Sequence, residues 1–242
     1  MLRFDQFMHQ ALHHPEKGYY ARRINTVGAQ GDFSTTATLS PILGRAIAAT
    51  FLEQKETTHL IEIGGGDGSL AQSVLRSIPF FKRLFSHYHI VDTSSPLTDV
   101  QKRKLGGRVH WHTDIKSALK KAKGNAFIFS NELVDAFPVR IFQRSNKHLT
   151  ELHLTGAEEH FEEANAPDIY SSALSDIQLA ENSRIELHQS YYEWLHDWLP
   201  LWNKGQMLTI DYGDTYPELY YRMPHGTLRA YAHHQRPGLC LS

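Results

Sequence analysis

Short apolar segments alternate with amphipathic segments through the middle of the chain. Residues 59–63, 87–91 and 109–112 are short runs rich in apolar side chains, and each precedes a segment with apolar residues at helical spacing. Residues 126–130 are nearly all apolar, as expected for a strand that is covered on both faces. One more apolar run, at 206–210, follows an aromatic-rich helical segment. The alternation predicts an α/β fold, with βαβ units forming one parallel sheet that has helices on both faces.

The pattern changes after the fourth predicted strand. Residues 139–144 and 148–154 resemble two strands around a Ser-Asn-Lys turn, so we expect an antiparallel hairpin inserted there. Residues 158–168 are acidic, and we expect a loop. The predicted organisation is an N-terminal helical segment and cleft loop at 1–55, then one domain at 56–242 with an insertion at about 139–190.

The composition restricts the class of protein. Hydrophobic residues make up 41% of the chain and charged residues 21%, which excludes a disordered polypeptide. The formal net charge of -1 provides no global attraction to nucleic acid or anionic lipid, so we expect neither as a partner. A single cysteine, Cys240, excludes an internal disulfide framework. With no signal or transit peptide visible and no apolar run near the roughly 20 residues of a membrane span, we expect a cytoplasmic protein of undetermined oligomeric state.

A glycine-rich turn at 64–68 is the strongest local signal. It follows the first predicted strand directly, and Glu62 stands two residues before its first glycine. Glycines at this position let the backbone approach a ligand closely. Gly64, Gly66 and Gly68 have a G-x-G-x-G spacing, whereas a dinucleotide fingerprint needs a glycine where Ser69 stands. The pattern favours the donor loop of a class I methyltransferase over an ordinary glycine-rich turn.

Aspartates follow the next two predicted strands. Asp92 is placed to accept hydrogen bonds from both hydroxyls of a ribose, and its alternative role is to cap the following helix. Asp114 follows the third strand, where it can accept a hydrogen bond from an adenine amino group. Capping the helix after Asp114 is an equally good interpretation.

The segment after the fourth strand contains a third group of polar residues. Asn131, Glu132 and Asp135 stand beside an apolar run, at the strand end that faces the transferred methyl group in this architecture. Two carboxylates and a carboxamide suit a cationic or hydrogen-bonding nucleophile. The alternative is a polar loop that only closes the strand.

Sixteen histidines raise the question of a metal site. Histidine pairs stand at 87/89, 110/112 and 233/234, but without cysteine companions or the spacing of a zinc hydrolase. We therefore predict no metal.

Together, blocks in the same order along most of the chain resemble the MidA-like methyltransferases, whose eukaryotic members are mitochondrial complex I assembly factors. Those blocks are Phe7 and Met8; Gly18, Tyr19 and Tyr20; Gly31, Asp32 and Phe33 with Thr35; residues 62–68; residues 131–139; Asp211, Tyr212 and Gly213; and Gly226, Thr227, Leu228 and Arg229 with His233.

The resemblance implies a class I fold, S-adenosylmethionine as the methyl donor and a protein substrate, which is an arginine of a complex I subunit in the mitochondrial branch. It further implies two sets of cleft residues. Gly31, Asp32 and Thr35 would contribute to donor binding. Tyr212, Arg229 and His233 would contribute to substrate binding. The alternatives are a non-catalytic assembly protein with the same fold and a small-molecule methyltransferase.

Two departures from the family pattern stand out. The family typically has glutamate at the ribose position, where this chain has the shorter Asp92. Family members also continue into two last strands, whereas this chain stops at Ser242. We therefore expect residues 206–210 to form an exposed edge of the sheet.

Overall fold

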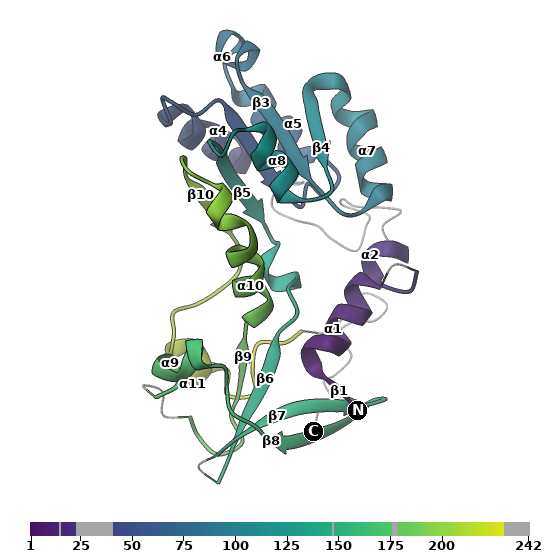
Figure 1. Cartoon of the computed structure of the whole chain (residues 1–242), viewed down its shortest axis with the longest axis vertical. Coiled ribbons are helices and arrows are strands. Elements are labelled where there is room, and N and C mark those ends of the chain that lie inside the picture. Colours follow the sequence, from purple (N-terminus) through teal and green to yellow (C-terminus); the bar gives the residue numbers. More distant parts are fainter. Residues whose placement is uncertain (15, 23–40, 147, 176–178, 230–242) are drawn as a thin grey trace. The chain divides into compact units, whose positions relative to one another are not determined.

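The computed structural model describes residues 1–14, 16–22, 41–146, 148–175 and 179–229 (Figure 1). The chain divides into two compact units. The parallel unit comprises Pro15–Asp135 and Trp194–Asp211, and the antiparallel unit comprises Met1–His14, Ala136–Glu193 and Tyr212–Ser242. The sequence-based boundary at residue 55 stays a prediction.

The parallel unit contains a five-stranded sheet with the strand order β10-β5-β2-β3-β4, which confirms the predicted α/β fold. Among the described residues, β10 lies at one edge of this sheet, as the sequence predicts. The strands are β2 (His59–Ile63), β3 (His87–Val91), β4 (Val109–His112), β5 (Phe127–Asn131) and β10 (Met207–Ile210).

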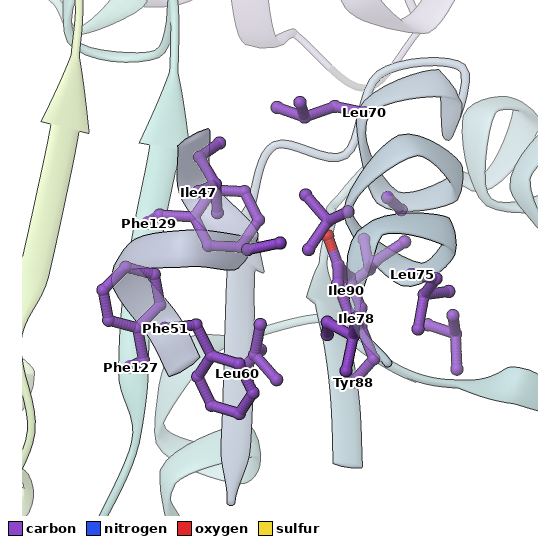
Figure 2. Packing of buried hydrophobic residues seen from close by; sticks show 14 of the residues in the cluster. Ile47, Phe51, Leu60, Leu70, Leu75, Ile78, Tyr88, Ile90, Phe127 and Phe129 are labelled. Atoms are coloured by element: carbon purple, nitrogen blue, oxygen red, sulfur yellow. The ribbon is translucent and has the colours of Figure 1, made fainter. Parts of the chain in front are cut away.

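Helices cover both faces of the parallel sheet, and each face has its own hydrophobic cluster. On one face, α4 and α5 pack over Leu60, Tyr88 and Phe129 (Figure 2). On the other face, α8 and the indole of Trp198 pack over Ile61 and neighbouring side chains. The parallel unit contains the helices α2 (Tyr19–Arg22), α4 (Ile42–Glu53), α5 (Ser69–Ser77), α6 (Phe80–Leu84), α7 (Ser95–Leu105) and α8 (Ile115–Lys121). Helix α10 (Gln189–Trp198) begins in the antiparallel unit and ends in the parallel one.

The antiparallel unit contains a second five-stranded sheet, with the order β1-β7-β6-β9 and with β8 paired to β7. The predicted hairpin is confirmed as β6 and β7. The structure adds the N-terminal strand β1 to it, a pairing between segments about 150 residues apart that no local pattern indicates. The elements are β1 (Leu2–Arg3), α1 (Phe4–His13), β6 (Arg140–Ser145), β7 (His148–Thr155), β8 (Glu158–Glu163), α9 (Ser171–Ser175), β9 (Arg184–Leu187) and α11 (Glu218–Arg222).

The loop predicted at 158–168 is wrong for its first half, which is strand β8. This strand pairs with β7 along its full length, from Thr150↔Glu163 to Thr155↔Glu158. Its glutamates are compatible with a strand because β8 lies at the margin of the sheet, where most of its side chains meet solvent. Phe161 alone packs against a hydrophobic cluster, so the sequence carries almost no apolar signal.

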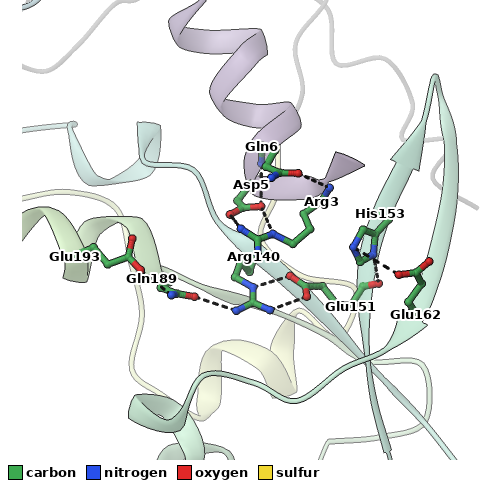
Figure 3. A network of polar contacts seen from close by, with 9 residues as sticks. All are labelled: Arg3, Asp5, Gln6, Arg140, Glu151, His153, Glu162, Gln189 and Glu193. Atoms are coloured by element: carbon green, nitrogen blue, oxygen red, sulfur yellow. Dashed lines mark hydrogen bonds and ion pairs between the residues drawn. The ribbon is translucent and has the colours of Figure 1, made fainter. Parts of the chain in front are cut away.

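Ion pairs stabilise the interior of the antiparallel sheet. The Arg140 guanidinium donates two hydrogen bonds of 2.6 Å to the Glu151 carboxylate, and a third of 3.0 Å to Gln189 (Figure 3). Arg184 binds the Glu159 carboxylate in the same two-pronged way. Each pair joins two strands, and such bidentate geometry gives directional as well as electrostatic stabilisation.

Candidate active site

The glycine loop between β2 and α5 adopts a backbone that requires glycine. Gly64, Gly66 and Gly68 have φ angles of 75°, 51° and 80°, in the left-handed region. The Gly68 amide closes the turn on the Gly65 carbonyl at 2.9 Å. A Cβ built on Gly66 would meet no atom within 4 Å, so this glycine faces open space. The loop therefore presents bare backbone at the carboxyl end of β2, where open α/β sheets bind ligands.

Two side chains of α7 hold this loop, and sequence analysis did not identify either. Gln101 is fully buried, and its amide nitrogen donates to the Gly66 carbonyl at 2.9 Å. One turn further on, Lys104 forms an ion pair with Asp67 at 2.6 Å. Burial alone would raise the pKa of Asp67, but hydrogen bonds from Lys104 and Ser69 outweigh it and lower that pKa. Only the spacing of Gln101 and Lys104 on one helix face could have indicated this role.

Asp92 follows β3 and belongs to the same network. Its Oδ2 accepts a 2.8 Å hydrogen bond from Gln101, and its Oδ1 accepts one of 2.9 Å from the Ser94 amide. Burial raises the pKa of Asp92, although these hydrogen bonds oppose the rise. Since Gln101 also binds Gly66, one side chain fixes Asp92 relative to the glycine loop. The Gly65 backbone also donates to this carboxylate, which can accept about four hydrogen bonds, so Asp92 retains the capacity to accept a hydroxyl group.

Glu62 lies below the loop, in the interior. It is 2% exposed and accepts a 2.8 Å hydrogen bond from the Tyr88 hydroxyl. Burial raises the pKa of Glu62 to about 8, while the Tyr88 hydrogen bond lowers it and the charges of Asp92 and Asp67 raise it. Its part in donor binding stays a prediction.

The loop after β5 contains the candidate transfer residues. Glu132 has a φ of 50°, a left-handed conformation that is costly for a residue with a side chain. Asp211, at the end of β10, fixes this backbone: its Oδ2 lies 3.1 Å from the Leu133 amide, 2.7 Å from that of Val134 and 3.3 Å from that of Asp135. The sequence placed Asp211 within a family block, without assigning it this role.

The two loops are in contact at the carboxyl edge of the sheet. A Cβ built on Gly64 would lie 3.1 Å from Cδ1 of Leu133, so a larger residue at Gly64 would press on the transfer loop. Tyr20 of α2 faces the same loop. Burial raises the pKa of Tyr20 to about 12, and the negative charge of Asp135 adds to the rise. The structure thus brings Tyr20, residues 62–68 and residues 131–135 into one part of the parallel unit.

Asp114, Tyr212 and Arg229 are the other predicted site residues that the structure describes. Asp114 caps α8, with its Oδ1 accepting from the Ser117 amide at 2.8 Å, which confirms its alternative interpretation; adenine recognition stays a prediction. Tyr212 and Arg229 belong to the antiparallel unit, and both are exposed. Gly31, Asp32, Thr35 and His233 lie outside the described residues.

A buried carboxylate organises the family block at 226–229. The Oε1 of Glu186 accepts from the amides of Thr227 and Leu228 at 2.6 and 3.3 Å. Gly226 has a φ of 88°, and a Cβ there would collide with Glu186. The glycine of this block is therefore required by the close approach of Glu186, a reason that lies in the antiparallel unit itself.

Histidines form a hydrogen-bonded row on the parallel sheet. His89 lies 2.9 Å from His59 on one side and 2.9 Å from His112 on the other. Desolvation and the neighbouring imidazoles lower the pKa of His59 to about 4 and that of His89 to about 3. In the described part of the chain, no group of three or more histidine, cysteine, aspartate or glutamate residues is arranged to hold a metal ion.

Comparisons with known proteins identify the family. Residues 42–239 match the family described as "Putative S-adenosyl-L-methionine-dependent methyltransferase". The chain belongs to this family. The resemblance found in the sequence is thereby confirmed.

Curated relatives include the mitochondrial protein arginine methyltransferase NDUFAF7 of Xenopus tropicalis and of Danio rerio. The first is 27% identical over 58% of this chain and 39% of its own length, and the second is 26% identical over 74% and 50%. A likely methyltransferase from Burkholderia thailandensis, solved with S-adenosyl-homocysteine bound, has a TM-score of 0.75 and 26% identity, covering 93% of this chain and 62% of its own. The chain therefore spans about two fifths to one half of these curated relatives.

Proposed function

We propose that this protein transfers a methyl group from S-adenosylmethionine to a protein side chain, with arginine as the acceptor. The observation that carries the proposal is the glycine loop fixed to Asp92 by Gln101, in a fold whose Burkholderia relative binds S-adenosyl-homocysteine. That compound is what the donor becomes when it loses its methyl group. The arginine acceptor rests on the names of the NDUFAF7 relatives.

The residues of the parallel unit fit such a donor. Open space beside Gly66 leaves backbone accessible, and Asp92 offers carboxylate lone pairs at the end of the neighbouring strand. Ribose hydroxyls are hydrogen-bond donors that a carboxylate at this position accepts. We assign Glu62, Gly64 and Gly68 to the same site because they belong to the strand end and loop that would hold the donor, and recognition of adenine by Asp114 is part of the same proposal.

The chemistry assigned to the transfer loop is positioning and charge balance. The donor supplies a methyl group on a positively charged sulfur, which keeps the bonding electron pair and becomes neutral. An acceptor guanidinium carries a proton at neutral pH because its pKa lies above about 12. Glu132 and Asp135 would bind that cation and orient one nitrogen, and that nitrogen passes a proton to one of these carboxylates, and from it to water, as its bond to the methyl carbon forms. Asn131 would add a hydrogen bond, and the gain from orientation alone reaches roughly 7–11 kcal/mol in favourable cases.

A protein substrate is the partner we propose. The sequence-based expectations of a cytoplasmic location and of no nucleic-acid partner belong to the same proposal. In the described residues, no helix has both the length and the apolar character to cross a bilayer.

Calorimetric titration of the purified chain with S-adenosylmethionine tests the donor site. We expect micromolar binding that is lost in Asp92→Ala. Binding should be kept in the control Asp99→Ala, because Asp99 is an exposed aspartate of α7, the helix that follows Asp92. A folded wild-type chain that binds no donor contradicts the donor site and favours a non-catalytic assembly protein.

Transfer of a labelled methyl group to cell extract, separated by size, tests the acceptor. Label in protein, identified as methylarginine after hydrolysis, is the expected result. Label only in small molecules overturns the protein substrate. If Glu132→Gln leaves both donor binding and methylation unchanged, the role proposed for Glu132 is wrong.

A further inference from the structure

The short helix α6 exposes apolar side chains that belong to no hydrophobic cluster of the described residues. None of its five residues is buried. Phe80, Phe81 and Leu84 are 59%, 77% and 61% exposed, and Phe85, directly after the helix, is 72% exposed. A single exposed apolar residue is ordinary, but four large ones within six positions mark a surface that interacts with something. We call these four residues the α6 tip.

The fold holds the α6 tip in a fixed outward position. Ile78, just before it, is 2% exposed and anchored in the main hydrophobic cluster. The Arg83 guanidinium donates to the Leu75 carbonyl at 3.1 Å, and the Ser86 hydroxyl donates to that of Lys82 at 2.9 Å. The rings of Phe80 and Phe81 are therefore presented by a braced turn, so their exposure is built into the local structure.

The charged residues around the α6 tip indicate which kind of partner this surface would bind. Between Asp67 and Asp92 the chain contains no aspartate or glutamate, whereas Arg76, Lys82 and Arg83 are all cationic. At about 100° per residue, the four apolar side chains occupy an arc of about 140°, with Lys82 beside it. An apolar arc with cations at its rim is the pattern of segments that enter the interface of an anionic bilayer.

The position of α6 leaves the candidate active site accessible. Helix α6 immediately precedes β3, which begins at His87. Helix α6 therefore lies at the amino-terminal edge of the parallel sheet. Figure 1 shows α6 at the end of this unit, beyond α5 and the start of β3. The glycine loop lies at the opposite, carboxyl-terminal edge, so attachment through α6 would not cover it.

We propose that the α6 tip attaches the protein peripherally to an anionic lipid bilayer, with the three phenylalanines and Leu84 entering the headgroup region. A bilayer accommodates rings that point in several directions, whereas a protein partner needs a pocket shaped for each of them. The near-zero net charge, from which the sequence predicts no membrane partner, is a global average. The α6 tip and its cations are a local departure from it.

Co-sedimentation of the full chain with lipid vesicles tests the proposal. We expect the chain to bind vesicles that contain phosphatidylglycerol, to bind pure phosphatidylcholine much more weakly, and to dissociate as salt increases. The double variant Phe81→Ser/Phe85→Ser should lower vesicle binding at least about tenfold. Lys82→Glu should lower binding to the anionic vesicles selectively.

Tyr221→Ser is the matched control, because Tyr221 is 55% exposed on α11 of the antiparallel unit and should not affect vesicle binding. Melting temperatures of all variants should match the wild type, since the substituted side chains are exposed. Absence of binding to anionic vesicles, or equal binding by the double variant, overturns the proposal. So does sedimentation velocity showing a wild-type dimer that the double variant abolishes, because the occupant is then a second copy of the chain.

Discussion

Two loops at the carboxyl ends of neighbouring strands each turn through left-handed residues, but they are held in place in different ways. The loop after β2 turns sharply with three glycines in left-handed conformations, and it is held from outside by Gln101 and Lys104. The loop after β5 contains no glycine between 131 and 138. It turns through Glu132, whose φ is 50°, and it is held by the Asp211 carboxylate.

The difference follows from what each loop has to present. A loop that offers bare backbone to a ligand gains from glycine, because no side chain stands in the way. A loop that must aim side chains cannot use glycine at the aimed position, so it retains a strained residue and needs a neighbouring group to hold the strain. Four substitutions test this contrast.

The largest effect should come from removing the anchor of the transfer loop. Asp211→Ala leaves three backbone amides without their acceptor, and we expect kcat to fall about 100-fold through loss of orientation. The donor dissociation constant should change little, because the glycine loop has its own supports. Methyl-transfer kinetics and calorimetry measure the two effects. Asp214→Ala, at an exposed aspartate nearby in sequence, is the control, and full activity in Asp211→Ala contradicts the anchoring role.

Gln101→Glu should weaken donor binding by about 30-fold near pH 8, because it removes two hydrogen-bond donors and places a carboxylate against Asp92. As the pH falls, the new carboxyl group takes up a proton and can donate one hydrogen bond again. Donor affinity should therefore recover on acidification, an effect that simple loss of packing cannot produce. Calorimetry across pH measures it, with Gln10→Glu at an exposed position as the control. An affinity loss that is independent of pH would falsify the charge-based account.

Glu62→Gln should raise stability above neutral pH. The native pKa of Glu62, about 8, lies above the 4.5 of an unperturbed glutamate, so between these values the native state keeps a proton that the unfolded state releases. Stability of the wild type therefore falls as the pH rises through this window. The glutamine variant keeps the Tyr88 hydrogen bond without that penalty and should gain roughly 3–4 kcal/mol at pH 8, because each unit of pKa difference is worth about 1.4 kcal/mol. Urea unfolding from pH 5 to pH 8 measures the difference, which should fall below about 1 kcal/mol near pH 5.

The exposed Glu53→Gln serves as the control for that series. If the two variants show the same pH dependence, the carboxyl group of Glu62 does not titrate as its burial indicates.

Glu132→Gly should raise the stability of the protein slightly, the smallest stability effect in this series, and should lower its activity. Glycine relieves the left-handed conformation, so we expect a gain of about 0.5–1 kcal/mol in unfolding free energy together with a loss of methyl transfer. Asn146→Gly is the matched control, since Asn146 has a φ of 48° in an exposed turn of the antiparallel sheet. It should gain similar stability without losing activity. A destabilised Glu132→Gly means that the side chain has contacts worth more than the strain.

Local patterns in the sequence were sufficient for the parallel sheet. The runs at 59–63, 87–91 and 109–112 coincide with β2, β3 and β4, because their buried apolar residues mark short strands even though each strand also contains histidine. The glycine spacing at 64–68 likewise indicates a sharp turn with left-handed residues, which glycine adopts readily. In contrast, β8 was missed because a strand at the margin of a sheet can be almost wholly charged.

The sequence by itself determined the class of fold, the position of the glycine loop and the family. Each of these is written in residues close together in the chain, through periodicity or through backbone freedom. Only the tertiary structure decided that Gln101 joins Asp92 to Gly66, that Asp211 holds the loop at 131–135, and that the α6 tip is left uncovered. These depend on which residues the fold brings together across long separations. A hydrogen bond between a side chain and a backbone group 35 or 77 positions away leaves no periodic trace in the chain. Nor does the absence, among the described residues, of an element that covers α6.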